Sequence, residues 1–351
     1  MPREYFLGGS TSNGYRTAFF EEQKGKYGYY LKGGPGTGKS TILKTIAAEF
    51  REESVSIYHC SSDPSSLDAV VLEERGVFIV DATAPHEQNI ALPYITGEHI
   101  DLAACLNSKL LQANYESVLG FHTENLAAHQ KARRGLVGIS AMQDTVWDIG
   151  KKALLSEKLM AYARRLAKRV LATVKTNPSE GRIMERQTAA LTPDGWLTFV
   201  PEGYDTIVLE DSLGCAASVL LALFSEVSAA QGICCEVTRA TAQTDAPILH
   251  LVIPDLKVML LTVTPFAPCN LTPTNLIRMQ RFYDAEQLKS KRNLIKFCVK
   301  NAESMRAYTQ SQLKEALSLH DALEEYYISA QNRKKLNARS NALIAELRQK
   351  S

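Results

Sequence analysis

The sequence lacks any long apolar run. No stretch approaches the roughly 18 consecutive apolar residues of a membrane-spanning helix, although 45% of the 351 residues are hydrophobic. Residues 1–5 (MPREY) also lack the basic-then-apolar layout that opens a secretion signal. We therefore expect no membrane span and a cytoplasmic location.

The sequence also lacks cysteines at metal-binding spacing and an excess of charge of either sign. The seven cysteines include no C-x-x-C pair, so we expect reduced and mostly buried thiols instead of a zinc site. The 40 basic and 38 acidic residues leave a net charge of +2, so a nucleic-acid partner is not indicated.

One glycine-rich motif stands out against this background. Residues 33–41 read GGPGTGKST, which matches the pattern G-x-x-x-x-G-K-[ST] of a phosphate-binding loop. Residues 27–31 before it are typical of a short buried strand, and residues 40–50 after it place apolar side chains on one helical face. Backbone amides at such a helix N-terminus bind anions, and glycine lets a phosphate approach them. The residues expected to bind the nucleotide are Gly33, Gly34, Pro35, Gly36, Thr37, Gly38, Lys39, Ser40 and Thr41. Lys39 would contact the β- and γ-phosphates, and the Ser40 hydroxyl would ligate Mg²⁺.

A later strand ends in an acidic residue. Residues 76–81 (GVFIVD) predict a buried strand with Asp81 at its carboxyl end, where open α/β sheets bind ligands. Asp81 is therefore expected in the Mg²⁺ shell, although such an Asp can also cap a turn. Ala82 follows, where many P-loop ATPases carry a water-activating Glu. His86 and Glu87 are the next candidates for a base, and both can equally be ordinary loop residues.

The chain also contains an internal repeat. Segments with matching patterns recur in the same order at offsets of about 176 to 181 positions: 11–19 and 192–199, 29–31 and 206–208, 55–60 and 232–236, 77–80 and 258–261. The helix after the glycine-rich loop recurs over 217–224. The repeat predicts two units, 1–176 and 177–351, which meet at the turn-forming residues NPSEG.

The second copy has lost the chemistry of the loop. Residues 210–217 (EDSLGCAA) stand in its place. The alignment sets three pairs opposite each other: Lys39 and Ala216, Ser40 and Ala217, Asp81 and Thr262. Glu210 and Asp211, opposite the leading glycines, would repel a triphosphate. We expect a retained fold that binds no nucleotide in the usual way.

These motifs carry a family resemblance. The loop is similar to that of P-loop NTPases, in a form common among AAA-type ATPases. Two tandem units, with HCSSDP at 59–64 and DATAPH at 81–86, resemble a bacterial family of double-P-loop ATPase-like proteins over nearly the whole chain. The degenerate second loop departs from the family pattern. The resemblance implies nucleotide binding and gives no substrate.

Helical segments are expected after each unit. The first covers about 100–174, with breaks near Gly120, Gly135 and Gly150, and the second covers about 273–347, with helices over 275–297 and 303–347. Such helices pack on the P-loop core or on each other, or recognise a partner. Arg133, Arg134, Arg239 and Arg278 are alternatives for an arginine that reaches the γ-phosphate. Arg133 and Arg134 are also explained as part of a solvated helix face.

The predicted fold class is thus α/β: a tandem pseudo-repeat of P-loop NTPase-type units, each a mostly parallel sheet between helices with a helical extension. The predicted function is a Mg-ATP-binding ATPase with one active and one inactive unit and Lys39, Asp81, His86 and Glu87 as catalytic candidates. One alternative is a kinase that passes the γ-phosphate to a small-molecule acceptor held by loops 59–63 and 81–87. Another is a slow-turnover, nucleotide-responsive protein whose helices bind a protein partner.

Overall fold

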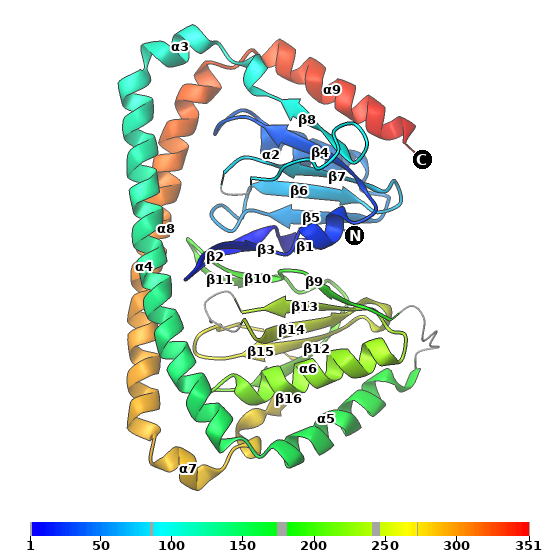
Figure 1. Cartoon of the computed structure of the whole chain (residues 1–351), viewed down its shortest axis with the longest axis vertical. Coiled ribbons are helices and arrows are strands. Elements are labelled where there is room, and N and C mark those ends of the chain that lie inside the picture. The colour runs from blue at the N-terminus through cyan, green and yellow to red at the C-terminus, as the bar shows by residue number, and fades with distance from the viewer. Residues whose placement is uncertain (1, 85–86, 174–180, 241–245, 272, 351) are drawn as a thin grey trace.

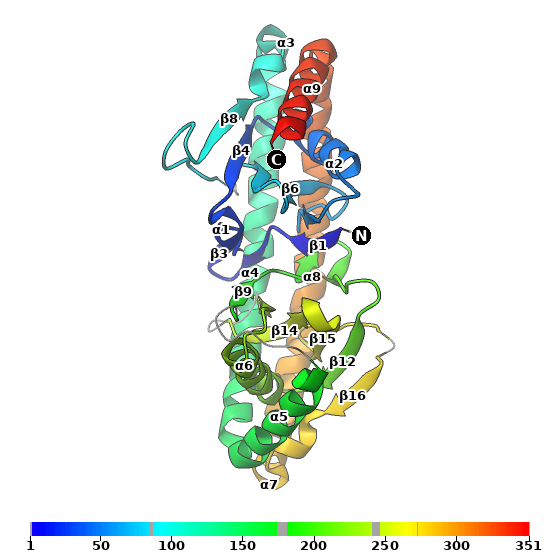
Figure 2. The ribbon, with the colours of Figure 1, turned by 90° about the vertical axis from the view of Figure 1, so that its right-hand side faces the viewer.

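The computed structural model describes residues 2–84, 87–173, 181–240, 246–271 and 273–350. Two β-sheets are stacked along the long axis of the molecule, and a pair of long helices runs beside both of them (Figures 1 and 2). The chain is therefore an α/β protein with two sheet-containing halves.

The first sheet has six strands. Their order is β1 (Arg3–Phe6), β5 (Val55–His59), β6 (Leu67–Leu72), β7 (Val77–Asp81), β4 (Tyr27–Lys32) and β8 (Gly97–Asp101). Pairs β1–β5, β4–β7 and β4–β8 are parallel, whereas β6 is antiparallel to both of its neighbours. All six residues of β6 are buried, as expected of a strand covered on both faces.

The second sheet repeats this arrangement strand for strand. Its order is β9 (Ile183–Glu185), β13 (Cys235–Arg239), β14 (Ile248–Ile253), β15 (Val258–Val263), β12 (Asp205–Glu210) and β16 (Asn275–Arg278), with β14 antiparallel. Each half also has a hairpin, β2 (Gly8–Thr11) with β3 (Gly14–Thr17) and β10 (Ala189–Thr192) with β11 (Gly195–Thr198). The α/β class with two mostly parallel sheets is confirmed, and the architecture is compatible with the two-unit repeat.

The helices differ from the prediction in their breaks. They are α1 (Phe20–Gln23), α2 (Lys39–Glu49), α3 (Ser108–Ala113), α4 (Tyr115–Ala153), α5 (Ser156–Val170), α6 (Cys215–Ala230), α7 (Ala285–Lys289), α8 (Arg292–Ser329) and α9 (Arg333–Gln349). Short 3₁₀ turns cover Ala103–Cys105, Leu171–Thr173, Pro254–Leu256 and Met279–Phe282. The expected breaks at Gly120, Gly135 and Gly150 were wrong, because α4 runs through all three.

Close helix packing explains one of these glycines. A Cβ on Gly135 would lie 2.1 Å from Thr309 Oγ1, so the glycine lets α4 approach α8. The helix expected over 275–297 was also wrong, since β16 and a 3₁₀ turn occupy its start and α8 continues unbroken past residue 297.

Each helical extension covers the opposite half (Figure 1). Helix α4 runs from the first sheet to the second, where α5 packs on α6 in one apolar core that includes Leu159, Leu166 and Phe224. Helix α8 returns to the first half, where Leu343 and Leu347 of α9 join the core around α2. The boundary predicted between residues 176 and 177 lies outside the described residues.

Candidate functional site

The glycine-rich loop lies where the motif requires it, between the carboxyl end of β4 and the start of α2. Gly38 caps α2 with φ 90°, and Gly36 has φ 62°, so both adopt the left-handed backbone that other residues avoid. The Thr37 hydroxyl donates to Gly34 O at 2.8 Å. Pro35 is half-buried, and Thr41 is exposed on the first turn of α2.

Lys39 and Asp81 come from separate motifs and meet at this point. The Lys39 ammonium lies 3.6 Å from an Asp81 carboxylate oxygen and donates to Gly33 O at 2.9 Å and Gly34 O at 2.8 Å. The two side chains are only 11% and 13% exposed. Asp81 also accepts from the Thr83 amide at 2.9 Å, so it caps the turn after β7 as well as facing Lys39. The lysine and the acid are thus held together at the carboxyl edge of two parallel strands.

Ser40 and Asp81 supply oxygen ligands of the kind that Mg²⁺ prefers. The Ser40 hydroxyl accepts the Leu67 amide at 3.0 Å, which fixes its oxygen at this edge of the sheet. No group of three or more His, Cys, Asp or Glu side chains in the described ranges is arranged to hold a metal alone. The donor set therefore fits a Mg²⁺ that takes its remaining ligands from phosphate and water.

The remaining candidates belong to the end of β5 and to the segments that follow β5 and β7. His86 lies outside the described residues, and Glu87 is exposed in the connection after β7. His59, at the end of β5, has its Nδ1 2.9 Å from Pro64 O and packs its ring on Phe199. Asp63 accepts from the Ser65 amide at 3.1 Å and so shapes its own loop. The residues proposed for an acceptor already have structural partners.

A buried acid beside Asp81 was missed in the sequence. Asp68 lies on β6, one position beyond the Ala69–Val80 pair, and therefore next to Asp81 on the adjacent strand. It is 5% exposed. Burial, reinforced by Asp68, raises the pKa of the Cys60 thiol well above its ordinary value. Strand β6 places Asp68 here, and the sequence alone predicts no strand over residues 67–72.

The loop of the second half is shorter and shifts the alignment. Six residues (33–38) separate β4 from α2, but only four (211–214) separate β12 from α6. Gly38 and Gly214 are equivalent, because each caps its helix with a left-handed φ. Lys39 therefore corresponds to Cys215 and Ser40 to Ala216, which corrects the predicted pairing by one residue. Asp81 does correspond to Thr262, since each pairs with the equivalent leucine of β4 or β12.

The second loop is filled by Asp211 from the loop itself and by Tyr283 from the segment before α7. Asp211, 1% exposed, accepts from the Ala217 amide at 2.9 Å and the Leu213 amide at 3.1 Å. The Tyr283 hydroxyl donates to Asp211 at 2.9 Å and accepts from the Ala216 amide at 2.7 Å. Burial raises the pKa of Asp211 even though these hydrogen bonds oppose the shift. The amides that would meet a phosphate at this helix N-terminus are therefore taken.

Glu210, by contrast, is not in the loop interior. It ends β12, is 56% exposed and lies 3.5 Å from Arg278. Only one of the two predicted repulsive carboxylates, that of Asp211, thus lies in the loop interior.

The predicted arginines point elsewhere in the described structure. Arg133 donates to Ser12 O at 3.3 Å, and Arg134 is exposed on α4. Arg239 pairs with Glu185 at 3.1 Å, and Arg278 pairs with Glu210. These contacts give none of the four a place at the loop 33–38.

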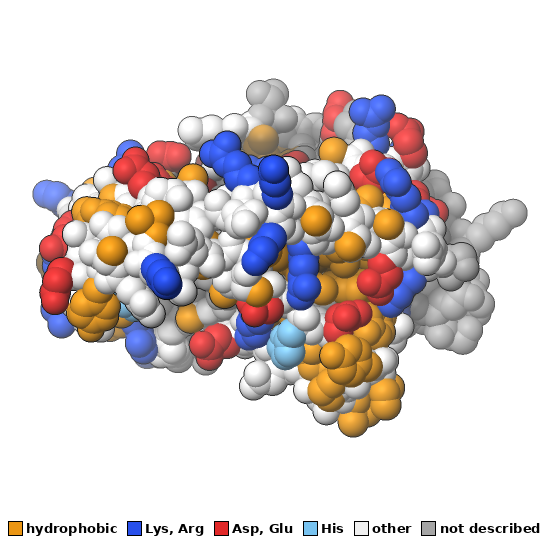
Figure 3. All heavy atoms as spheres, turned by 90° about the horizontal axis from the view of Figure 1, so that it is seen from above, with side chains coloured by type: hydrophobic (Ala, Val, Ile, Leu, Met, Phe, Trp, Pro, Cys, Tyr) orange, Lys and Arg blue, Asp and Glu red, His pale blue; other side chains and the backbone are white. Residues whose placement is uncertain are grey.

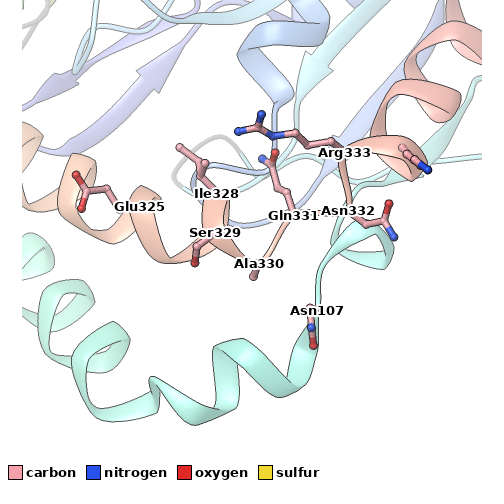
Figure 4. A pocket seen from close by; sticks show the side chains of 9 residues that line it. Asn107, Glu325, Ile328, Ser329, Ala330, Gln331, Asn332 and Arg333 are labelled. Atoms are coloured by element: carbon pink, nitrogen blue, oxygen red, sulfur yellow. The ribbon is translucent and has the colours of Figure 1, made fainter.

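The turn between α8 and α9 covers the glycine-rich loop instead. The Gly36 amide donates to Glu324 Oε1 at 3.0 Å, and the Gln331 side-chain amide donates to Gly36 O. A Cβ on Gly34 would lie 2.7 Å from the Tyr327 ring. Figure 4 shows Gln331 and Arg333 pointing to the same side of this turn, next to a surface cavity of about 710 Å³. Sequence patterns carried no signal for this contact.

The same end of the molecule carries many cations. Lys and Arg side chains cross the middle of the surface seen in Figure 3, with acidic side chains among them. Helix α9 begins with Arg333, Lys334 and Lys335 directly after the covering turn. Three consecutive basic residues therefore follow the covering turn, on a surface where both signs of charge occur.

Comparisons with protein-family models, curated proteins and solved structures find no match for the chain. Among the described residues, no helix is both long and apolar enough to cross a membrane.

Proposed function

We propose that the chain is a Mg-ATP-binding P-loop protein, an ATPase with one active and one inactive nucleotide unit. The observation that supports it is the meeting of Lys39 with Asp81 beneath a glycine-rich loop that caps a helix. Each part was expected from a different motif, and a P-loop site needs both at one sheet edge.

Each residue then has a defined task. The backbone N–H groups of Gly34 and of residues 36–39 bind the phosphates, whereas Pro35 has no N–H to donate. Lys39 exchanges its contacts with Gly33 O and Gly34 O for β- and γ-phosphate oxygens. Ser40 and Asp81 would hold Mg²⁺, which when bound neutralises the charge on the transferred phosphate. Asp68, which follows the Ala69–Val80 pair toward Asp81 and is buried, is a second candidate carboxylate for orienting a water or a hydroxyl nucleophile.

A slow-turnover, nucleotide-responsive protein is the second candidate. The α8–α9 turn favours it, because an element from the opposite half already contacts the loop. A kinase remains the third candidate because Ala82 replaces the water-activating Glu, but the internal contacts of His59 and Asp63 leave its acceptor loop less open.

The test follows the γ-phosphate. Wild type, Lys39→Ala and the exposed control Lys44→Ala are incubated with Mg·ATP, and ADP and phosphate are measured with and without a metabolite extract. Wild type and Lys44→Ala should bind the nucleotide and release both products steadily. Lys39→Ala should bind no nucleotide and release neither product. ADP formed without phosphate, and only with extract, would assign a kinase. Binding without turnover would assign the nucleotide-responsive protein, and absence of binding by wild type would refute the proposal.

A further inference from the structure

One carboxylate already occupies the glycine-rich loop. Glu324 is on the last turns of α8 and accepts the Gly36 amide at 3.0 Å. The same side chain lies 3.3 Å from His320 Nε2, one turn earlier on the helix. The hydrogen bond from His320, together with that from Gly36, lowers the pKa of Glu324 although burial opposes the shift. The group that meets the loop amide is therefore the charged form.

This contact uses a donor that a P-loop needs for its ligand. Amides of the loop between the strand and the helix point at the phosphates in a bound complex. A single N–H cannot donate fully to both Glu324 and a phosphate oxygen, and two anions at one amide repel each other. Binding of a triphosphate therefore requires Glu324 to leave.

The end of α4 at the second loop can be compared with the end of α8 at the first. The starts of α4 and α8, and those of α5 and α9, are each 177 positions apart (115 and 292, 156 and 333). At the same offset, Trp147 of α4 takes the place of Glu324. Its ring lies about 3.8 Å from the position of a Cβ on Gly214, in the inactive loop. Helix α4 thus presents an apolar ring to the loop 211–214, whereas α8 presents an anion to the loop 33–38.

We propose that Glu324 is an internal phosphate mimic, which holds the α8–α9 turn on the glycine-rich loop and is displaced when the nucleotide binds. The inference rests on the proposed nucleotide site and adds its regulation. Two further contacts hold the same turn on the loop: the hydrogen bond from Gln331 to Gly36 O and the packing of the Tyr327 ring over Gly34. Displacement of Glu324 therefore loosens the turn as a whole.

Nucleotide affinity and hydrogen exchange together test the idea. Glu324→Gln removes the charge and keeps the shape, and Glu325→Gln makes the same change at an exposed neighbour that lines the nearby cavity. Hydrogen bonds to a charged group are stronger than neutral ones, so Glu324→Gln should bind Mg·ADP about tenfold more tightly than wild type, which corresponds to about 1.4 kcal/mol. Glu325→Gln should match wild type. Saturating Mg·ADP should speed exchange of the wild-type amides 326–331.

The outcomes separate this inference from the proposed function. Binding of Mg·ADP by wild type but not by Lys39→Ala supports the nucleotide site. If Glu324→Gln and Glu325→Gln then have the same affinity for Mg·ADP, the phosphate mimic is refuted while the nucleotide site stands. Exchange at 326–331 that stays unchanged or slows on binding also refutes the displacement. Failure of wild type and of Glu324→Gln to bind any nucleotide refutes both proposals.

Discussion

Arg186 connects the two halves through a buried charge cluster. It is 6% exposed, and its guanidinium lies 2.6 Å from Glu22 of the first half and 3.0 Å from Glu236 of the second. It also donates to the Tyr5 hydroxyl at 3.0 Å. Burial alone would raise the pKa of Glu22, but Arg186 and then Lys26 outweigh burial and lower it.

Removal of this cation should destabilise the protein strongly. Breaking one side of a buried ion pair costs about 3–5 kcal/mol, because a buried charge is left without its partner. Here Lys26 remains 3.3 Å from Glu22 and Arg3 remains 2.8 Å from Glu236, so we expect Arg186→Met to lose about 3 kcal/mol. At a urea m value of about 3 kcal/mol/M, the midpoint of unfolding falls by about 1 M.

Urea unfolding followed by circular dichroism measures this loss. The exposed Arg182→Met is the matched control and should stay within about 0.5 kcal/mol of wild type. Adding Glu22→Gln to Arg186→Met should recover part of the loss, because one uncompensated charge disappears. An Arg186→Met midpoint equal to that of Arg182→Met would refute the view that this cluster holds the halves together.

Three further predictions concern single residues. Cys215→Lys should leave the stoichiometry at one nucleotide per chain by calorimetry, because Asp211 still fills a loop that is two residues short; a second bound equivalent would contradict this. Burial lowers the pKa of His250 to about 3. The imidazole therefore stays neutral in the folded protein, whereas in the unfolded protein it takes up a proton below about pH 6.5. The free energy of unfolding therefore decreases as pH falls, by up to about 1.4 kcal/mol per pH unit. In urea titrations at decreasing pH, His250→Gln should lose less of this free energy than the exposed control His122→Gln. Ser40→Ala should weaken Mg·ADP binding while leaving metal-free ADP binding unchanged, and equal weakening of both would contradict a metal role.

Short sequence patterns predicted those parts of the candidate site whose structure depends on neighbouring residues in the chain. The strand before the loop, the glycine-rich loop and α2 were all predicted within a residue or two, because apolar runs and glycines report backbone requirements directly. The strand that ends in Asp81 was predicted for the same reason. Strands β6 and β14 were missed, since a buried polar residue, Asp68 in one and His250 in the other, interrupts the apolar run that marks the other central strands. Asp68 was missed with β6.

Two other errors have a tertiary cause. Gly135 was taken as a helix break, whereas it serves the close approach of Thr309 from α8. The two-residue deletion before α6 falls between elements, so an alignment of repeats by pattern alone assigned the partner of Lys39 one residue too late. The Glu324 contact joins residues 288 positions apart, and no periodicity in either segment could indicate it.

The helical extensions give the second half a structural role in the first. Leu288 of α7 and the first turns of α8, at Cys298 and Ala302, are buried in the core of the second half. The other end of α8 carries Glu324 to the intact loop. At about 1.5 Å per residue, the 38 residues of α8 span about 57 Å, so the second half positions a side chain far from its own sheet. This role depends on the apolar core of the second half and requires no lysine at the position of Cys215.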